Sequence, residues 1–234
     1  MKYVLATLLT IGLLFSVCSA YEKVELKDER NKESYSLGYL FGENLKRQGI
    51  DINLEVYTTG IKDALGWKER LMSSEEINTT VKNLQQRLLV AQQKALKEQA
   101  AKNLSEGKAF LEENSKKEGV KMLPSGLQYK VLQEGLGKTP EETDTVTVHY
   151  RGTFIDGTEF DNSYKRGNPE TVAVVNVIPA WSEALRQMKE GAKWQLFVPP
   201  DLAYGERGQG SRIPPNSTLI FEIELISIQS NGSH

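Results

Sequence analysis

The sequence has few residues of the kinds that bind metals or form covalent links. Its 234 residues include one cysteine, Cys18, and two histidines, His149 and His234. Counting alone therefore nearly excludes a zinc site, a disulfide framework and a cysteine–histidine nucleophile pair. We expect no metal and no cofactor.

An excess of charge of one sign is lacking as well. The 29 Lys and Arg residues are balanced by 31 Asp and Glu residues, so the formal net charge is −2. Because a domain that binds nucleic acid normally carries a basic face, the sequence predicts no nucleic-acid partner. Hydrophobic residues make up 39% of the chain and charged residues 26%, which is typical of globular proteins. The length indicates one large domain or two smaller ones.

Long apolar runs are scarce too, and the one present lies at the N-terminus. Val4 to Val17 is nearly all apolar, but its about 14 residues are short of the ~20 that a membrane-spanning helix needs. Because this run follows Lys2 and precedes small residues, we interpret residues 1–20 as a signal peptide cleaved near Ala20. The alternatives are a retained anchor and a lipidated Cys18; the bulky Val17 argues against lipidation.

The N-terminal half has helical periodicity. Apolar residues fall near one face from Glu33 to Gln48, and again from Asn53, a candidate N-cap, to about Leu65. Gly49 interrupts the pattern between the two helices, and Gly66 ends the second.

A much longer helix is predicted from Ser74 to about Asn114. Ser73 and Glu76 have the spacing of a capping box, and apolar residues then recur in steps of four and three. About 40 residues would span roughly 60 Å, more than a small domain can cover. The helix would therefore pack on a second copy of the chain or connect two domains. The alternative is a shorter helix that is broken at Gly107 and packed within a bundle.

After Gly119 the period changes from helical to alternating, which indicates strands. One amphipathic helix, from Ala180 to Met188, interrupts them. This order predicts an α+β domain in which an antiparallel sheet wraps around one short helix. The five candidate strands are residues 126–132, 145–151, 172–177, 193–198 and 219–228.

Familiar catalytic templates do not fit. Gly135 to Thr139 resembles the end of a phosphate-binding loop, but the leading glycine is missing and a turn is the better interpretation. His149 is expected on the polar face of a strand, exposed to solvent. Asp156 and Gly157 separate two strand-like segments and predict a hairpin with a type I′ turn.

Aromatic residues near the ends of the predicted strands remain as candidates for a site. They could simply form the core, which suffices for Trp181 and Phe221. Tyr204 differs because it lies in a glycine-rich loop, where a lone buried ring would be unusual. The candidates are Tyr150, Phe160, Trp181, Tyr204 and Phe221.

Five segments, in order and spacing, resemble FKBP-type peptidyl-prolyl cis/trans isomerases. They are Val148-His149-Tyr150-Arg151-Gly152, Asp156-Gly157-Thr158-Glu159-Phe160-Asp161, Val177-Ile178-Pro179-Ala180-Trp181, Ala203-Tyr204-Gly205 and Ile213-Pro214-Pro215-Asn216-Ser217-Thr218-Leu219-Ile220-Phe221. The N-terminal half, including Ser34-Tyr35-Ser36-Leu37-Gly38, is similar to the macrophage infectivity potentiator and FkpA branch. The implied division is a signal peptide (1–20), a helical dimerisation region (21–72), a connecting helix (73–118) and an isomerase domain (119–234).

The resemblance implies a proline-binding pocket and a role for each residue in it. Trp181 would form the floor, the Ile178 N–H and the Tyr204 hydroxyl would hold peptide carbonyls, and Asp161 would lie on the wall. The residues implied to line the pocket are Tyr150, Phe160, Val177, Ile178, Trp181, Tyr204 and Phe221.

The resemblance also implies partners and a location. These are unfolded or proline-containing protein clients, a V-shaped homodimer formed through the N-terminal helices, chaperone activity, and macrolide inhibitors bound at the same pocket. The implied location is the periplasm, with association to the outer membrane as a further option.

Three positions depart from the family pattern. Val172 stands where an aromatic residue is usual, Ala180 replaces a glycine, and Arg212 occupies a loop position that often holds a smaller or apolar residue. The sequence therefore predicts weaker activity than in a member with the full aromatic wall.

Overall fold

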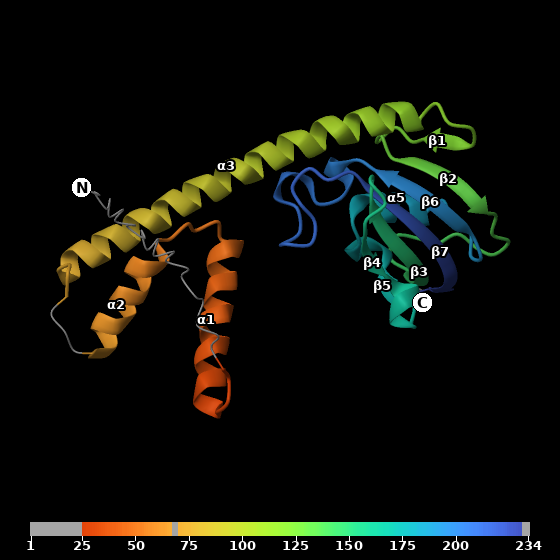
Figure 1. Cartoon of the computed structure of the whole chain (residues 1–234). Coiled ribbons are helices and arrows are strands. Elements are labelled where there is room, and N and C mark those ends of the chain that lie inside the picture. The colour runs from red at the N-terminus through yellow and green to blue at the C-terminus, as the bar shows by residue number, and fades with distance from the viewer. Residues whose placement is uncertain (1–24, 67–69, 231–234) are drawn as a thin grey trace, which may run out of the picture. The chain divides into compact units, whose positions relative to one another are not determined.

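The computed structural model describes residues 25–66 and 70–230 (Figure 1). The predicted signal peptide, including Cys18, lies outside these residues. In the described ranges, no helix is both long enough and apolar enough to cross a membrane. The chain divides into two compact units, Met1–Ile77 and Asn78–His234, and we describe each by itself.

The first unit contains two helices, α1 (Glu29–Arg47) and α2 (Leu54–Gly66). Helix α1 begins before the predicted start at Glu33, because the Asp28 carboxylate accepts a hydrogen bond from the Asn31 N–H at 2.7 Å and caps the helix. Asn53 caps α2 as predicted, through the Val56 N–H at 3.1 Å. Neither helix contains a buried residue, so the unit keeps most of its apolar side chains exposed.

Helix α3 (Ser74–Asn114) is continuous over 41 residues, which confirms the prediction of a long helix. The capping box forms: the Ser73 N–H donates to Glu76 Oε2 at 2.8 Å, and the Glu76 N–H donates to Ser73 Oγ at 3.2 Å. The alternative of a helix broken at Gly107 is wrong. A glycine costs a helix only about 1 kcal/mol, and here it also makes a close contact that is described below.

The second unit holds an antiparallel seven-stranded sheet and the short helix α5 (Pro179–Leu185), so the predicted α+β class is confirmed. The sheet curves around α5 (Figure 1). The strand order is β1-β2-β6-β7-β3-β4, and β5 also pairs with β3. The strands are β1 (Val120–Met122), β2 (Gln128–Gln133), β3 (Thr145–Phe154), β4 (Glu159–Asn162), β5 (Glu170–Ala173), β6 (Lys193–Val198) and β7 (Leu219–Gln229).

The core lies between α5 and the sheet. Alternate residues of β7 are buried as predicted, and α5 contributes four buried side chains to the same cluster. From β7 these are Leu219, Phe221, Ile223 and Leu225, and from α5 Ala180, Trp181, Ala184 and Leu185.

Several predicted boundaries are corrected. The strand candidate 172–177 ends at Ala173, because Val174–Asn176 is a 3₁₀ turn whose Val174 side chain is fully buried. Helix α5 ends at Leu185 rather than Met188, although Met188 is still buried in the turn that follows. Strand β1 was not predicted, since three residues are too few to show an alternating pattern.

The hairpin between β3 and β4 forms, but its predicted type I′ turn is wrong. The Gly157 N–H donates to the Phe154 carbonyl at 3.0 Å, so Ile155 and Asp156 are the central residues. A type I′ turn needs positive φ at both central residues, and in the described structure only Asn216 among the non-glycine residues has a positive φ. Gly157, with φ of 85°, follows the turn and returns the chain to β4.

The last part of α3 packs on the sheet of the second unit and on the loop before β7. Gly107 faces Thr218 so closely that an added Cβ would lie 2.1 Å from Thr218 Oγ1. The Asn103 amide donates to the Pro215 carbonyl at 2.7 Å, one turn earlier on the helix. Near the helix end, the Asn114 amide donates to Gln128 Oε1 in β2 at 2.9 Å. Side-chain contacts thus fix α3 against the loop from Ile213 to Thr218.

Candidate active site

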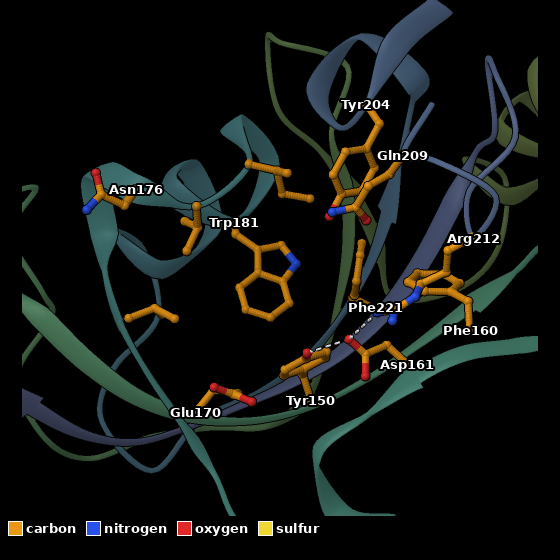
Figure 2. A pocket seen from close by; sticks show the side chains of 13 residues that line it. Tyr150, Phe160, Asp161, Glu170, Asn176, Trp181, Tyr204, Gln209, Arg212 and Phe221 are labelled. Atoms are coloured by element: carbon orange, nitrogen blue, oxygen red, sulfur yellow. Dashed lines mark hydrogen bonds and ion pairs between the residues drawn. The ribbon is translucent and has the colours of Figure 1, made fainter. Parts of the chain in front are cut away.

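The eight residues that the resemblance singled out all line one cavity of about 360 Å³ (Figure 2). Strands β3, β4 and β7 supply part of its wall, α5 supplies the tryptophan, and the loop after β6 supplies Tyr204. The eight residues are Tyr150, Phe160, Asp161, Val177, Ile178, Trp181, Tyr204 and Phe221.

Four aromatic rings form a connected wall. Trp181 meets Tyr150 edge-on at 4.9 Å between ring centroids and meets Phe221 edge-on at 5.3 Å. Phe160 continues the series, edge-on to Phe221 at 5.6 Å. Edge-to-face contacts of this kind stabilise ring pairs by about 0.5–1.5 kcal/mol beyond burial, so the wall is fixed before any ligand enters.

The local sequence explains how these rings come together. Gly152 in β3 pairs with Phe221 in β7, and the Phe160 ring lies over it, so that an added Cβ would be 2.6 Å from Phe160 Cζ. Pro179 stands at the first turn of α5, where it is favourable, and the helix carries Trp181 into the cavity. Gly152, the last residue of the first resembling segment, is thus required because a side chain there would collide with the Phe160 ring.

Three donors at the cavity have no partner in the described part of the chain. The Ile178 N–H and the Tyr204 hydroxyl form no hydrogen bond there. The Trp181 indole N–H is buried and also lacks an acceptor. The Trp181 N–H is excluded from water, where an unpaired polar group is costly.

Asp161 is held in a network of partners. The Tyr150 hydroxyl donates to its Oδ2 at 2.7 Å, and Arg166 forms an ion pair with its Oδ1. Burial alone would raise the pKa of Asp161, but the Tyr150 hydrogen bond and the nearby Arg166 charge outweigh it, and the pKa is lowered. Asp161 is therefore an anion at neutral pH.

The two tyrosines of the cavity stay protonated. Burial, followed by the hydrogen bond to Asp161, raises the pKa of Tyr150. Burial, followed by the negative charge of Asp161, raises the pKa of Tyr204. Near pH 7, Asp161 is therefore charged and both tyrosines are neutral.

Four residues at the site were not found from the sequence. Glu170, Asn176 and Gln209 line the cavity, and Arg166, outside the lining, binds Asp161, Glu170 and the Tyr150 hydroxyl. Arg166 lies in α4 (Ser163–Arg166), a four-residue helix that is too short for periodicity to reveal. The Asn162 side chain that caps α4 was the one available signal.

The three departures from the family pattern lie at different depths. Val172 and Arg212 line the cavity, whereas Ala180 is fully buried in the core and is not part of the lining. Val172 leaves the wall without the aromatic ring that the resemblance implies at that position.

The other candidates from the sequence are structural. Gly135 lies against the backbone of the turn before β6, where an added Cβ would be 2.5 Å from the Lys189 carbonyl oxygen. The segment from Gly135 to Thr139 is irregular, with a bend at Gly137, rather than the predicted turn. His149 is on the polar face of β3 but is not simply exposed: its ring stacks on Tyr164 at 4.3 Å and its Nδ1 lies 2.9 Å from Ser163 Oγ. In the part of the chain that the structure describes, no group of acidic, histidine or cysteine side chains could hold a metal ion.

An antiparallel sheet around one short helix, with an aromatic cavity over a tryptophan, defines an FKBP-type prolyl isomerase. The family model described as FKBP-type peptidyl-prolyl cis-trans isomerase matches residues 137–226. A second, described as the domain amino terminal to FKBP-type peptidyl-prolyl isomerase, matches residues 30–131. The chain belongs to the FKBP-type peptidyl-prolyl cis-trans isomerase family.

Within this family the chain is similar along its length to proteins of the Mip and FkpA type. It is 43% identical to the outer membrane protein MIP of Legionella longbeachae, over 98% of this chain and 99% of that protein. It is 43% identical to the peptidyl-prolyl cis-trans isomerase Mip of Coxiella burnetii, over 98% of this chain and 99% of that protein. The crystal structure of FkpA from Escherichia coli matches with a TM-score of 0.73 at 39% identity, covering 89% of this chain and 100% of that one.

Proposed function

We propose that the Trp181 cavity is the catalytic site and that it accelerates rotation about X–Pro bonds in exported protein clients. Trp181 forms the floor under the substrate proline, with Tyr150, Phe160 and Phe221 around it. The Ile178 N–H and the Tyr204 hydroxyl hold the peptide carbonyls beside the proline. Val177 completes the apolar wall, and Asp161 fixes Tyr150 at the edge.

The reaction suits a site without an acid or base. Resonance keeps the X–Pro bond planar, with a barrier to rotation of ~18–20 kcal/mol. Twisting the bond removes the resonance and leaves a less polar carbonyl beside a pyramidal nitrogen. A dry aromatic cavity favours this twisted state over the planar, strongly dipolar one, which is the difference that lowers a barrier.

The observation that carries the proposal is the pairing of a fixed aromatic wall with free donors at one cavity. The polar atoms of the wall are the Tyr150 hydroxyl, which is engaged by Asp161 and Arg166, and the unpaired Trp181 N–H. Beside the wall, Ile178 and Tyr204 present donors without a partner among the described residues. The arrangement fits a ligand with one apolar ring and flanking carbonyls.

Replacing Tyr204 with phenylalanine tests this proposal. Loss of one hydrogen bond to the substrate should lower kcat/KM for a proline tetrapeptide about threefold to tenfold, since such a bond contributes about 0.5–1.5 kcal/mol. Proline-isomerisation kinetics of the wild type, of this variant and of Asp161→Ala provide the measurement. A wild type that holds unfolded clients but does not turn over the peptide would instead favour the second candidate, a chaperone whose cavity only binds proline segments.

We further propose that the chain forms a homodimer through its N-terminal helices, in the V-shaped arrangement that the resemblance implies. Exposed apolar side chains on the first unit support a self-associating surface: Leu37 is 71% exposed and Leu40 62% exposed in α1, and Val56 is 64% exposed in α2. Such a dimer would present two cavities to one client and increase avidity, which is the basis for the proposed chaperone activity.

The double variant Leu37→Glu with Leu40→Glu should therefore be monomeric. Light scattering would measure its mass, and small-angle scattering of the wild type would test the V shape. Glu43→Lys, also on α1, serves as a control that changes charge without adding a polar group to the apolar face. A dimer that survives the double substitution would exclude this surface.

The location and division of the chain complete the proposal. We propose export to the periplasm, with cleavage near Ala20, and a division into residues 21–72, 73–118 and 119–234. Mass spectrometry of the mature N-terminus separates this cleavage from lipidation at Cys18. Macrolide inhibitors are proposed to compete for the same cavity, with lower affinity because Val172 replaces an aromatic ring.

A further inference from the structure

The backbone around Arg212 is held in place at the edge of the cavity. Gln209 and Ile213 exchange backbone hydrogen bonds of 2.8 and 3.2 Å, and the Arg212 N–H donates to the Gln209 carbonyl at 3.1 Å. The next side chain, Ile213, is only 2% exposed and anchors the loop in the core. Arg212 therefore extends from a fixed point.

Its guanidinium is nevertheless largely unengaged. The side chain is 63% exposed and, within the described residues, forms a single ion pair, 3.9 Å from Asp161 Oδ2, and no hydrogen bond. Arg166, which pairs with the other carboxylate oxygen of Asp161, differs because it binds Asp161, Glu170 and the Tyr150 hydroxyl together. Figure 2 shows Arg212 beside Phe160 and Asp161, at the edge of the cavity that contains Trp181.

The acidic groups nearby are already engaged by other cations. Asp161 already accepts from Tyr150 and pairs with Arg166, and Glu170 pairs with Arg166. Glu159 pairs with Arg151 and Lys165. The planar guanidinium of Arg212 thus keeps donors available, in the fork geometry that binds a carboxylate at two points.

We propose that Arg212 is a specificity-determining residue that favours clients with an acidic side chain next to the proline. The inference depends on the proposed placement of the substrate proline over Trp181. Arg212 and Trp181 line the same cavity, so the side chain of a residue adjacent to the proline passes within reach of the guanidinium. A lysine at that position meets a like charge instead.

A simpler role, in which Arg212 only screens Asp161, makes a different prediction. Screening would change the turnover of every peptide by the same factor. Direct recognition changes the ratio of kcat/KM between acidic and basic peptides, and the ratio falls as salt screens the exposed charges.

The test uses the full chain and short peptides with Glu, Gln or Lys immediately before the proline, and a second set with these residues immediately after it. Wild type should prefer Glu over Lys by roughly fivefold in at least one set, since exposed charge pairs contribute up to about 1 kcal/mol. Arg212→Gln should abolish the preference and Arg212→Glu should reverse it. Arg207→Gln, an exposed residue of the same loop outside the cavity lining, is the matched control and should retain it.

Each outcome is decisive. A Glu-to-Lys ratio that is unchanged in Arg212→Gln overturns the inference, and so does an equal loss in Arg207→Gln, because the preference would then arise from the overall charge. The Gln peptides test the proposed function separately. If the wild type turns over the Gln peptides but shows no preference between Glu and Lys peptides, the role of Arg212 is overturned and the proposed function stands. If the wild type turns over no peptide, both proposals fail.

Discussion

Replacing Trp181 with leucine is expected to lower kcat/KM for a proline tetrapeptide by about tenfold to a hundredfold. Leucine remains apolar but removes the flat surface under the substrate ring and the edge contacts with Tyr150 and Phe221. The lost contacts are of the size of a buried side chain, about 1.5–3 kcal/mol, and every 1.4 kcal/mol corresponds to a factor of ten. Proline-isomerisation kinetics under conditions where the variant is folded give the measurement.

Trp194 supplies a matched control for this change. Both tryptophans are 6% exposed, both have an indole N–H without an acceptor in the described structure, and both belong to the same core. Trp194 stacks on Tyr129 at 4.4 Å and does not line the cavity. Trp194→Leu should thus lower stability to a similar extent while kcat/KM changes less than threefold. Equal losses of activity in the two variants would show that Trp181 acts only through stability.

Replacing Gly107 with alanine should destabilise the isomerase domain, although alanine is the better helix former. The new Cβ would lie 2.1 Å from Thr218 Oγ1 and 3.0 Å from Thr218 Cβ, which forces the helix or the loop to move. Overpacking costs about 1–3 kcal/mol, against a gain of about 1 kcal/mol in helix propensity. We expect a net loss of up to about 2 kcal/mol, read from urea denaturation by tryptophan fluorescence.

Thr218 allows this explanation to be tested directly. Its hydroxyl is buried without a partner in the described residues, so Thr218→Ala alone should cost little. In the double variant Gly107→Ala with Thr218→Ala, the clash with Thr218 Oγ1 is removed. Much of the stability lost in Gly107→Ala should therefore be recovered. Gly60→Ala, in α2, meets no atom within 4 Å and should not lower stability. Strictly additive effects of the Gly107 and Thr218 substitutions would contradict the proposed contact.

The elements predicted well from the sequence are those with a local physical cause. The pairing of Ser73 with Glu76 marked the start of α3, and the alternation from Leu219 to Leu225 marked the buried face of β7. The eight cavity residues were named through resemblance, because their meeting depends on strand register and on the ring of Phe160 lying over Gly152.

The elements predicted poorly depend on tertiary contacts or on very short segments. The 3₁₀ turn after Ala173 forms because the Val174 side chain enters the core. The sequence predicted a strand there instead, because a β-branched residue such as valine is also typical of strands. Arg166 ends the four-residue helix α4 and folds back onto Asp161 in β4, and so short a helix leaves no pattern in the sequence that shows the two meet. The turn at Asp156 has residues that satisfy two turn types, and the register of β3 and β4 decides between them.

The contacts of α3 with the loop before β7 limit where this chain can change in length. Asn103 and Gly107 each face one point on the loop, and the helix turns by about 100° per residue, so a single residue inserted between them would turn one of the two away. An insertion on the N-terminal side of Gln99 leaves both contacts intact. Natural variation in chain length, and the linkers or tags that an engineer adds, should therefore be tolerated before Gln99 and rejected between Ala100 and Asn114.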